Sequence, residues 1–561
     1  MAKSKQAPPA PSGWWPAIII LVGLAAYWNS LDSPFVYDDL GFIKNNPAIH
    51  HAANLLRLWT RDYYAITAGA ASYRPIGAMI WVLDGLLFGN NAFGFNLSSL
   101  LLHLVNSYLV FRIGAEFFLS VEAAGWAGLL FAVHPVHTSP VNCVAFNGDI
   151  LATLFLLLAM DSYLKLCRDP QHYWKHAMVP LWFGSALLSK EVALMFLPAL
   201  LLYEILNIGP TVRDKVKNWL GLCGITAVYL GLRFGPLRSP LEASKAYIGG
   251  SLAANLMTVS QLPIKYLWLL VYPSHLSVYH DVTIVTRATQ VEFLISAALL
   301  VFLGWLLCRL FFISRRSFFF AAWIILGLLP TMNLIPFANL KTLFAVRFLY
   351  LPSVGFCWLV ALGWERWRAL HKSAAKLAAV FAILICSLRT YARNKDWSSE
   401  ENLMNQAITD APFLAGFQQG SQHLAEGRPE AAQELALALP AAPNEDEAAL
   451  VRNDLAVALE RLGQHEEAIA LLVESLEKGH TEARLYANLG TVYYHMGHYR
   501  LAARYLEQAV AREPHDAGMH FNLSLVEKML KNGARSQQEL RLAHQLGPNI
   551  TDIQFWITLR Q

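Results

Sequence analysis

The sequence predicts an all-α protein in which a polytopic membrane domain of about eleven spans precedes a soluble domain of helical repeats. The 561-residue chain is 55% hydrophobic and only 15% charged, which is too apolar for a soluble protein of this length. Residues 14 to 390 carry most of the apolar excess, whereas from about Arg393 the chain is polar and rich in Ala, Glu and Leu. We therefore expect an integral membrane protein with a polar C-terminal region.

About eleven apolar stretches approach the roughly 20 residues that a helix needs to cross a bilayer core. They lie near 14–31, 93–112, 121–133, 150–166, 176–188, 191–207, 218–233, 291–312, 318–332, 348–363 and 375–390. The first stretch follows Lys3 and Lys5 without a small-residue cleavage site, which predicts an uncleaved signal anchor.

The distribution of basic residues predicts the orientation of these spans. With the N-terminus inside, the inner loops fall near 112–120, 165–176, 208–217, 309–317 and 364–376. Lys and Arg are about threefold denser in these loops than in the outer loops, in agreement with the positive-inside rule. An odd number of spans then places the C-terminal region on the outer face.

The C-terminal region repeats itself at a period of 34 residues. Leu455, Leu489 and Leu523 follow this spacing, and so do Gly463 and Gly497. The period, the small residues and a closing proline are typical of the tetratricopeptide repeat. We expect a membrane domain over 1–392, a linker over 393–412 and about four repeats over 413–561, the first of them degenerate.

A solenoid of this kind presents a concave groove that fits a peptide or a helix of an acceptor protein. The alternative is a surface for dimerisation or assembly. The net charge of +4 comes with no basic stripe, so nucleic acid is not an expected partner. The six cysteines are scattered and predict neither a disulfide framework nor a metal site.

Two adjacent carboxylates, Asp38 and Asp39, follow the first predicted span directly. They lie in one of two long outer loops, 32–92 and 234–290, which contain amphipathic pieces rich in Trp, Tyr and Leu. Such pieces lie in the membrane interface. A pair of carboxylates at a membrane surface is costly, so we interpret it as part of an outer active site.

Eight short motifs resemble a known family when taken in chain order and followed by tetratricopeptide repeats. The motifs are Phe35-Val36-Tyr37-Asp38-Asp39, Tyr73-Arg74-Pro75, His103-Leu104-Val105-Asn106, the run from Phe131 to Thr138, Gly148-Asp149, Ser189-Lys190-Glu191, the run from Arg347 to Phe356, and Arg393-Asn394-Lys395-Asp396-Trp397. The chain resembles the transmembrane and tetratricopeptide-repeat-containing protein O-mannosyltransferases. This resemblance implies a polytopic membrane GT-C glycosyltransferase fold with a polyprenyl-phosphate sugar as donor and no further cofactor.

By analogy with the first-loop aspartate of GT-C enzymes, Asp38 is the first candidate for the catalytic base. Transfer to a hydroxyl needs a group that takes the acceptor's proton, and a carboxylate can also stabilise positive charge on the sugar ring. Asp39 is the alternative base, or it orients the acceptor or a neighbouring group. The structural alternative for either residue is a helix cap.

Arg347, Arg74 and Lys190 are the candidates for binding the donor phosphate. The two arginines lie on the outer side, against the positive-inside trend, and arginine suits bidentate phosphate contacts. The alternative is snorkelling to ordinary lipid headgroups. Lys190 is expected to bind the same phosphate, or to pair with Asp38 or Glu191.

Five further residues of the motifs are candidates for contacts with the substrates. They are His134, His137, Asp149, Glu191 and Tyr350. The two histidines are three residues apart, but no third metal ligand is evident except Asp149, so we expect no metal. The alternatives are a satisfied interfacial pair for the histidines and dipole compensation at a helix N-terminus for Asp149.

The leading functional hypothesis is an inverting transfer of mannose or another hexose to Ser and Thr hydroxyls of exported proteins on the outer or luminal face. Alternatives are a lipid or envelope polysaccharide as acceptor, and a non-enzymatic membrane scaffold or transporter. The nearly charge-free spans disfavour transport, because transporters place ionisable residues near the membrane midplane. The short repeat array favours a bacterial inner membrane with periplasmic repeats over an endoplasmic reticulum membrane with luminal repeats.

Overall fold

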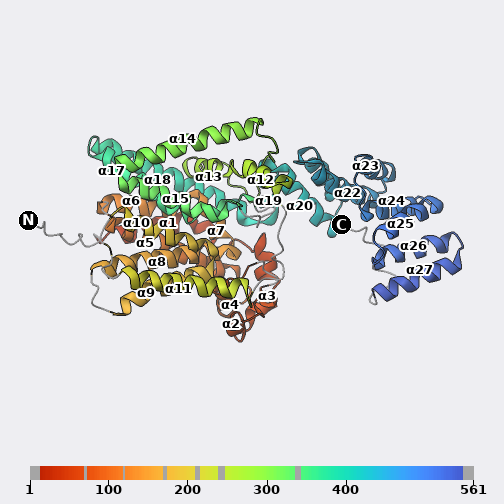
Figure 1. Ribbon diagram of the computed structural model, residues 1–561, viewed down its shortest axis with the longest axis horizontal. Helices are drawn as coiled ribbons and strands as arrows, with labels where there is room; N and C mark the ends of the chain where they lie inside the picture. The colour runs from red at the N-terminus through yellow and green to blue at the C-terminus, as the bar shows by residue number, and fades with distance from the viewer. Residues whose placement is uncertain are drawn as a thin grey trace, which may run out of the picture. The chain divides into compact units, whose positions relative to one another are not determined.

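The computed structural model describes residues 13–547 except 68–71, 118–119, 169–172, 209–210, 212–214, 238–246 and 335–342. Over these residues all regular elements are helices, and no β-strand is found (Figure 1). The chain divides into two compact units: unit 1 contains residues up to 278 and 285–406, and unit 2 contains 279–284 and residues from 407 onward. The predicted all-α class is confirmed.

Every apolar stretch that the sequence predicts as a span corresponds to a helix of unit 1. In chain order they are α1 (Trp15–Tyr27), α5 (Ala92–Glu116), α6 (Val121–Val133), α8 (Asn147–Arg168), α9 (Tyr173–Ser189), α10 (Phe196–Ile205), α11 (Lys215–Phe234), α14 (Val291–Ile313), α15 (Arg315–Leu328), α17 (Pro352–Arg368) and α18 (Lys372–Asn394). Within the described residues, four segments are long and apolar enough to cross a membrane: Ala92–Glu116, Val144–Arg168, Val291–Ile313 and Lys372–Ser398. The expected number of eleven spans is therefore not confirmed.

The two long outer loops are helical in large part. The first contains α2 (Asn54–Arg57), α3 (Tyr63–Ile66) and α4 (Pro75–Phe88), and the second contains α12 (Leu252–Val259) and α13 (Leu262–Val271). The sequence did not predict α4 as an apolar helix of its own. Its first residue is Pro75, which suits the first helical turn because its missing N–H has no partner there anyway.

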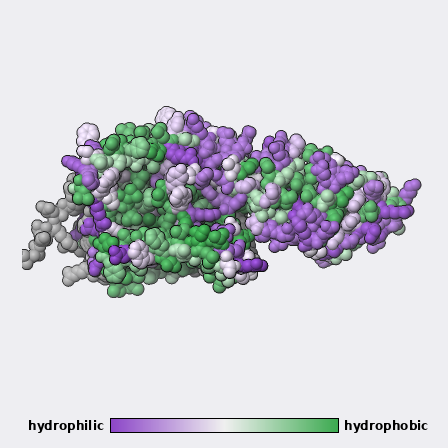
Figure 2. All heavy atoms as spheres, turned by 90° about the horizontal axis from the view of Figure 1, so that it is seen from above, coloured by the Kyte–Doolittle hydropathy of each residue, from purple (hydrophilic) through white to green (hydrophobic). Residues whose placement is uncertain are grey.

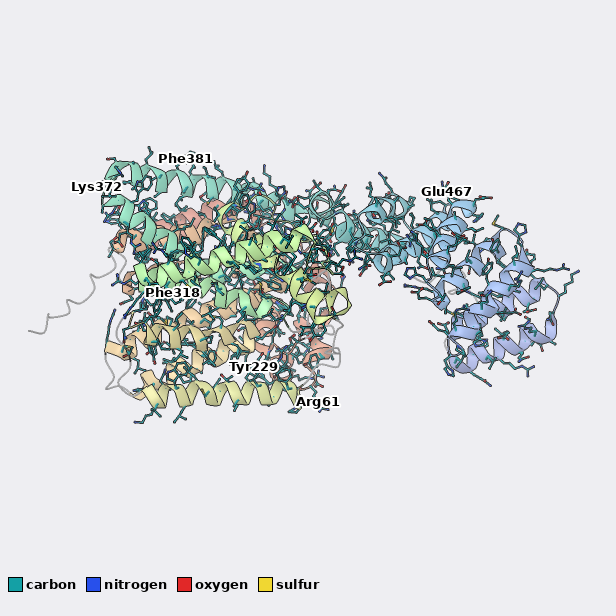
Figure 3. All side chains as sticks on the ribbon, turned by 45° about the horizontal axis from the view of Figure 1, so that its top comes forward. Arg61, Tyr229, Phe318, Lys372, Phe381 and Glu467 are labelled. Carbon is teal, nitrogen blue, oxygen red and sulfur yellow. The ribbon has the colours of Figure 1, made fainter. Side chains whose placement is uncertain are left out.

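Hydrogen bonds and ion pairs join the predicted inner loops to one another. Arg168 forms an ion pair with Glu116, which links the loops after α8 and α5. The Ser120 N–H donates to Glu365 Oε1 at 2.8 Å, which links the loop before α6 to the end of α17. These loops therefore lie at the same end of the helical bundle, as the predicted orientation requires. Figure 3 places Lys372 at this end of unit 1 and Arg61 at the opposite end.

Two helices of unit 1 present nearly their whole apolar surface outward. Only 6% of the apolar window of α14 and 11% of that of α18 is buried. Phe381 of α18 is 60% exposed, and Figure 3 shows it pointing away from the bundle. Figure 2 shows large apolar areas on the visible face of unit 1. Surfaces of this size are typical of helices that contact lipid, and the protein is an integral membrane protein.

The segment expected to be a linker, 393–412, contains buried side chains and short helices. Arg393 and Trp397 are fully buried, and the short helix η10 (Lys395–Ser398) leads into α19 (Glu400–Asp410). Arg393 contacts Asp396, Gln406 and the Leu276 carbonyl oxygen, all within unit 1. A buried guanidinium needs such partners, and Arg393 finds them within unit 1. The linker assignment stays a prediction. The boundary between the units lies at 406/407.

Unit 2 is built from consecutive antiparallel helix pairs. The pairs are α20 (Pro412–Ala425) with α21 (Glu430–Ala438), α22 (Glu445–Arg461) with α23 (His465–Glu477), α24 (Ala483–His495) with α25 (Tyr499–Arg512), and α26 (Ala517–Met529) with α27 (Gly533–Leu546). Gly463 and Gly497 of the 34-residue period end the first helix of their pairs at φ +78°, a conformation that glycine adopts without strain. Residues 548–561 of the predicted repeat domain lie outside the described residues.

Candidate active site

Asp39 is the buried member of the carboxylate pair. It is 1% exposed, and it precedes the short helix η2 (Leu40–Lys44). Its carboxylate accepts hydrogen bonds from the backbone N–H groups of Val144 at 3.1 Å and Ala145 at 2.7 Å, both in the short helix η5 (Val144–Phe146). Burial raises the pKa of Asp39 to about 7, although these two amides oppose the rise. Asp39 thus joins the first outer loop to the segment before α8.

Asp38 is the more accessible member of the pair, because its side chain is only half-buried. The residue before it, Tyr37, adopts φ +58°, which is uncommon for an aromatic residue. The Tyr37 N–H donates to Glu400 Oε2 of α19 at 2.6 Å, and its ring meets Phe146 edge-on with centroids 6.1 Å apart. The loop 37–39, which we call the acidic loop, is therefore held from two sides by residues distant in sequence.

Arg347 lies in the short helix η9 (Val346–Leu349) and is held by aromatic rings. Its guanidinium carbon is 4.1 Å from the centroid of Phe146 and 5.2 Å from that of Phe348. Arg347 is half-buried, and within the described ranges no ion pair neutralises it. Stacking on a ring fixes a guanidinium while leaving its N–H groups available at the edge. Phe146 thus connects Arg347 to the acidic loop through a single side chain.

Lys190 and Asp149 form a buried ion pair next to Arg347. The Lys190 Nζ lies 2.7 Å from Asp149 Oδ1 and 2.6 Å from Oδ2. It also lies 5.2 Å from the centroid of Phe348, the ring that Arg347 contacts. Burial lowers the pKa of Lys190, while the Asp149 carboxylate opposes this change. The partner of Lys190 is therefore Asp149, and not Asp38 or Glu191 as the sequence suggested.

Arg74 and Glu191 form a second ion pair with two-pronged geometry. Arg74 donates from Nε at 2.9 Å and from Nη2 at 2.6 Å to the two oxygens of Glu191, the first residue of η6 (Glu191–Met195). Arg233 of α11 approaches the same carboxylate at 3.5 Å and lies beside Tyr229. Figure 3 shows Tyr229 on the part of α11 that lies near Arg61.

Arg233 is a member of this site that the sequence analysis missed. It is an arginine at the outer end of a predicted span, the same anomaly that singled out Arg347 and Arg74. We call the six residues Arg74, Asp149, Lys190, Glu191, Arg233 and Arg347 the charged cluster. It contains four basic and two acidic side chains, so it has an excess of positive charge next to the acidic loop.

The predicted substrate contacts His134, His137 and Tyr350 are buried side chains, and their role in substrate binding stays a prediction. His134 is 2% exposed and its Nε2 is 3.0 Å from the Leu270 carbonyl oxygen. His137 Nδ1 is 2.8 Å from the Phe131 carbonyl oxygen, and its Nε2 is 2.7 Å from Ser353 Oγ. Of these rings Tyr350 lies nearest to the charged cluster, because the Asn106 amide donates both to its hydroxyl and to the carbonyl oxygen of Ile150, the residue after Asp149.

Tyr350 completes a second polar group, which we call the histidine cluster, together with His103, His134 and His137. The Tyr350 hydroxyl is 2.9 Å from His103 Nδ1, and it accepts from the Asn106 amide at 3.1 Å. The His137 and Tyr350 rings are in edge contact, with centroids 4.9 Å apart. Because Tyr350 directly follows η9, this cluster supports the helix that carries Arg347.

Within the described residues, no group of three or more His, Cys, Asp or Glu side chains is arranged to hold a metal ion. The expected absence of a metal stays a prediction. The acidic loop and the charged cluster bring a carboxylate pair next to stacked and paired cations. This combination can remove a proton on one side and bind an anion on the other.

A comparison with protein families identifies the class to which these features correspond. A family model described as dolichyl-phosphate-mannose-protein mannosyltransferase matches residues 74–232, which include Arg74, Asp149, Lys190 and Glu191. Two tetratricopeptide-repeat models match residues 447–512 and 488–548. The predicted repeat class is therefore confirmed, and residues 74–232 of the membrane part are similar to the mannosyltransferase family.

Individual proteins are similar to this chain over a longer stretch than the family model. The chain is 28% identical over 437 residues to the human protein O-mannosyl-transferase TMTC3. The aligned region covers 70% of this chain and 47% of the relative. It is 27% identical over 467 residues to human TMTC4, with 72% and 63% covered. The resemblance to the transmembrane and tetratricopeptide-repeat-containing O-mannosyltransferases is confirmed. The chain spans about half the length of the curated relatives it matches.

Among solved structures, the chain is similar to the oligosaccharyltransferase of Archaeoglobus fulgidus in complex with zinc and sulfate. The similarity has a TM-score of 0.39 and a sequence identity of 13%, and it covers 68% of this chain and 53% of the other.

Proposed function

We propose that this protein is a membrane glycosyltransferase that moves mannose or another hexose from a polyprenyl-phosphate donor to Ser or Thr hydroxyls of exported proteins. The observation that carries the proposal is the position of Arg347. Its guanidinium has no ion pair within the described chain, is fixed on Phe146, and lies next to the acidic loop. A cation held beside a carboxylate in this way suits a reaction with an anionic leaving group.

In the proposed reaction Arg347 binds the donor phosphate. Lys190 and Arg74 contribute mainly through the electrostatic potential of their positive charges at the phosphate. Both of these residues are already paired, with Asp149 and Glu191 respectively. A phosphate would have to compete with these carboxylates for Lys190 or Arg74, but not for Arg347. The negative charge that develops on the lipid phosphate as the sugar leaves is therefore stabilised first by Arg347.

Asp38 is the proposed base, and Asp39 is the proposed anchor of the acidic loop. The acceptor oxygen attacks the anomeric carbon, Asp38 takes the hydroxyl proton, and the bond between the anomeric carbon and the phosphate oxygen breaks with inversion. Asp39 is less suited to this role, because its oxygens already accept from the amides of Val144 and Ala145. The carboxyl-to-amide contacts instead hold Asp38 in position.

The repeats of unit 2 are the proposed binding site for the acceptor protein. Tetratricopeptide repeats stack into a curved surface that binds extended or helical segments. We place the active site on the outer face of a bacterial inner membrane with the repeats in the periplasm; the luminal face of the endoplasmic reticulum is the alternative. A lipid or polysaccharide acceptor would leave the repeats without a role in substrate choice.

The test is transfer by the purified full-length chain from dolichyl-phosphate mannose to exported proteins, followed by intact mass. We expect Asp38→Asn to lower turnover by about 10² to 10⁴-fold, the usual contribution of a general base. Asp62→Asn is the matched control, because Asp62 lies in the same loop but is exposed and paired with Arg57. Undiminished turnover by Asp38→Asn would remove Asp38 from the base role. Transfer by the wild type to lipid alone would contradict the proposed acceptor.

A further inference from the structure

The backbone of the acidic loop is strained immediately before Asp38. Tyr37 is one of four non-glycine residues with positive φ among the described residues, at φ +58°. An aromatic side chain in this left-handed region is disfavoured and persists only where the surroundings enforce it. The direction of the Asp38 side chain depends on this conformation, because the two residues share a peptide bond.

One contact that enforces this conformation comes from α19, more than 360 residues away in sequence. Glu400, the first residue of α19, accepts the Tyr37 N–H at 2.6 Å. Its carboxylate is half-buried and lies close enough to Asp38 for the two charges to interact. Burial raises the pKa of Glu400, while the Tyr37 amide opposes the rise. Two carboxylates placed this close repel each other, so the bond to Tyr37 must hold Glu400 against that repulsion.

The other side of the loop is held independently. Asp39 is fixed to η5 by the amides of Val144 and Ala145, and the Tyr37 ring rests on Phe146 of the same element. Without Glu400, these contacts would still retain the loop near η5. None of these contacts involves the Tyr37 N–H, which belongs to the Val36–Tyr37 peptide. Its hydrogen bond to Glu400 fixes that peptide on the N-terminal side of the Tyr37 Cα, and the Leu40 N–H, which donates to the Tyr37 carbonyl oxygen at 3.1 Å, holds the peptide on the other side. Together the two bonds set the φ of Tyr37. The loss of Glu400 is therefore expected to misorient Asp38 without unfolding the loop.

We propose that Glu400 is a positioning residue that holds Tyr37 in its left-handed conformation and thereby directs the Asp38 carboxylate toward the acceptor hydroxyl. This inference rests on the proposed function of Asp38, and it assigns a role to a residue outside the motifs of the membrane domain. Glu400 acts through a hydrogen bond from the backbone and does not itself contact substrate. The essential property of its side chain is an acceptor oxygen, not a negative charge.

The test compares Glu400→Ala, Glu400→Gln and Glu401→Ala in the full-length chain. Glutamine keeps an acceptor oxygen at the same reach, and Glu401 is an exposed neighbour on the same helix. We expect Glu400→Ala to lower kcat by roughly tenfold or more, because small misplacements of a catalytic group are costly. The donor KM should stay within about twofold, because Arg347 is untouched. Glu400→Gln should recover most of kcat, and Glu401→Ala should match the wild type.

Hydrogen exchange of a peptide covering residues 34–40 provides a readout that does not depend on activity. Glu400→Ala should accelerate exchange at Tyr37, and Glu400→Gln should restore protection. An inactive wild type with this exchange pattern would contradict the proposed function but leave the contact itself intact. The inference is overturned if Glu400→Ala keeps full kcat, if glutamine rescues no better than alanine, or if exchange does not change.

Discussion

The charged cluster and the histidine cluster lie close together in unit 1 and both come from the motifs, yet they are built in opposite ways. In the histidine cluster His103 and His137 are fully buried, and each ring nitrogen has a protein partner. In the charged cluster Arg347 is half-buried and stacked on aromatic rings, and no carboxylate of the described residues pairs with it. We therefore expect the motif residues whose hydrogen-bonding groups are already filled to support the site, and Arg347 to be available to a ligand.

The two clusters are also connected, because the histidine cluster packs beneath the helix that carries Arg347. His137 reaches Ser353 and the ring of Tyr350, which directly follow η9. Buried polar groups of this kind are expensive to leave unpaired, so a fully satisfied network holds its elements in one arrangement. We therefore expect the position of Arg347 to depend on the buried residues of the histidine cluster.

The largest expected effect that tests the difference between the two clusters is that of Arg347→Ala. We expect kcat/KM for the donor to fall by about 10² to 10³-fold, the effect of losing one charged group that stabilises developing negative charge. The melting temperature in detergent should change little, because no ion pair is lost. Arg347→Lys should recover only part of the activity, since lysine cannot provide the planar two-pronged contact. An unchanged kcat/KM for Arg347→Ala would remove the observation on which the proposed function depends.

The converse experiment is His137→Ala. This change removes two hydrogen bonds and the ring contacts to Phe131 and Tyr350, and we expect a loss of roughly 3 kcal/mol in stability. Thermal unfolding in detergent measures this loss of stability. Activity per folded molecule should fall much less than in Arg347→Ala. A variant with normal stability and a raised KM would instead support the direct substrate contact that the sequence analysis predicted for His137.

The smallest expected effect concerns the pH dependence of Asp39. Its pKa is about 7 in the folded protein against an ordinary value of 3.8, so folding retains a proton that the unfolded chain releases between these values. The contribution of Asp39 to stability is therefore favourable at low pH and lost as pH rises through about 4 to 7. The slope is at most about 1.4 kcal/mol per pH unit.

This dependence is measured as the difference in unfolding free energy between the wild type and Asp39→Asn. We expect the difference to shift in favour of the variant as pH rises from 4 to 7, and to become flat above that range. Asparagine loses one of the two amide contacts at every pH, which adds a constant offset without a slope. A difference that does not vary with pH would mean that Asp39 ionises normally in the folded protein.

Much of the fold was predictable from local patterns. Apolar runs near 20 residues predicted the helices, and the 34-residue period predicted the paired helices of unit 2, with Gly463 and Gly497 at the turns. The helix α4 was missed because it is a short apolar helix within a loop that was interpreted as interfacial. The burial of Arg393 at the start of the expected linker could not be predicted, because polarity alone does not reveal that this residue has its own buried partners.

The membrane character, the repeats and the candidates Asp38, Arg74, Lys190 and Arg347 could be predicted from local sequence, because charged residues at the ends of apolar runs can be recognised without a structure. Which of these side chains are paired is visible only in the folded chain, since pairing joins residues from different helices. The fold buries Asp39 against backbone amides and leaves Asp38 half-buried, and it pairs Lys190 with Asp149. It also places Arg233 beside Glu191, and Glu400 beside Tyr37. The physical reason is that a charge has a role only through its surroundings, and those surroundings are assembled by folding.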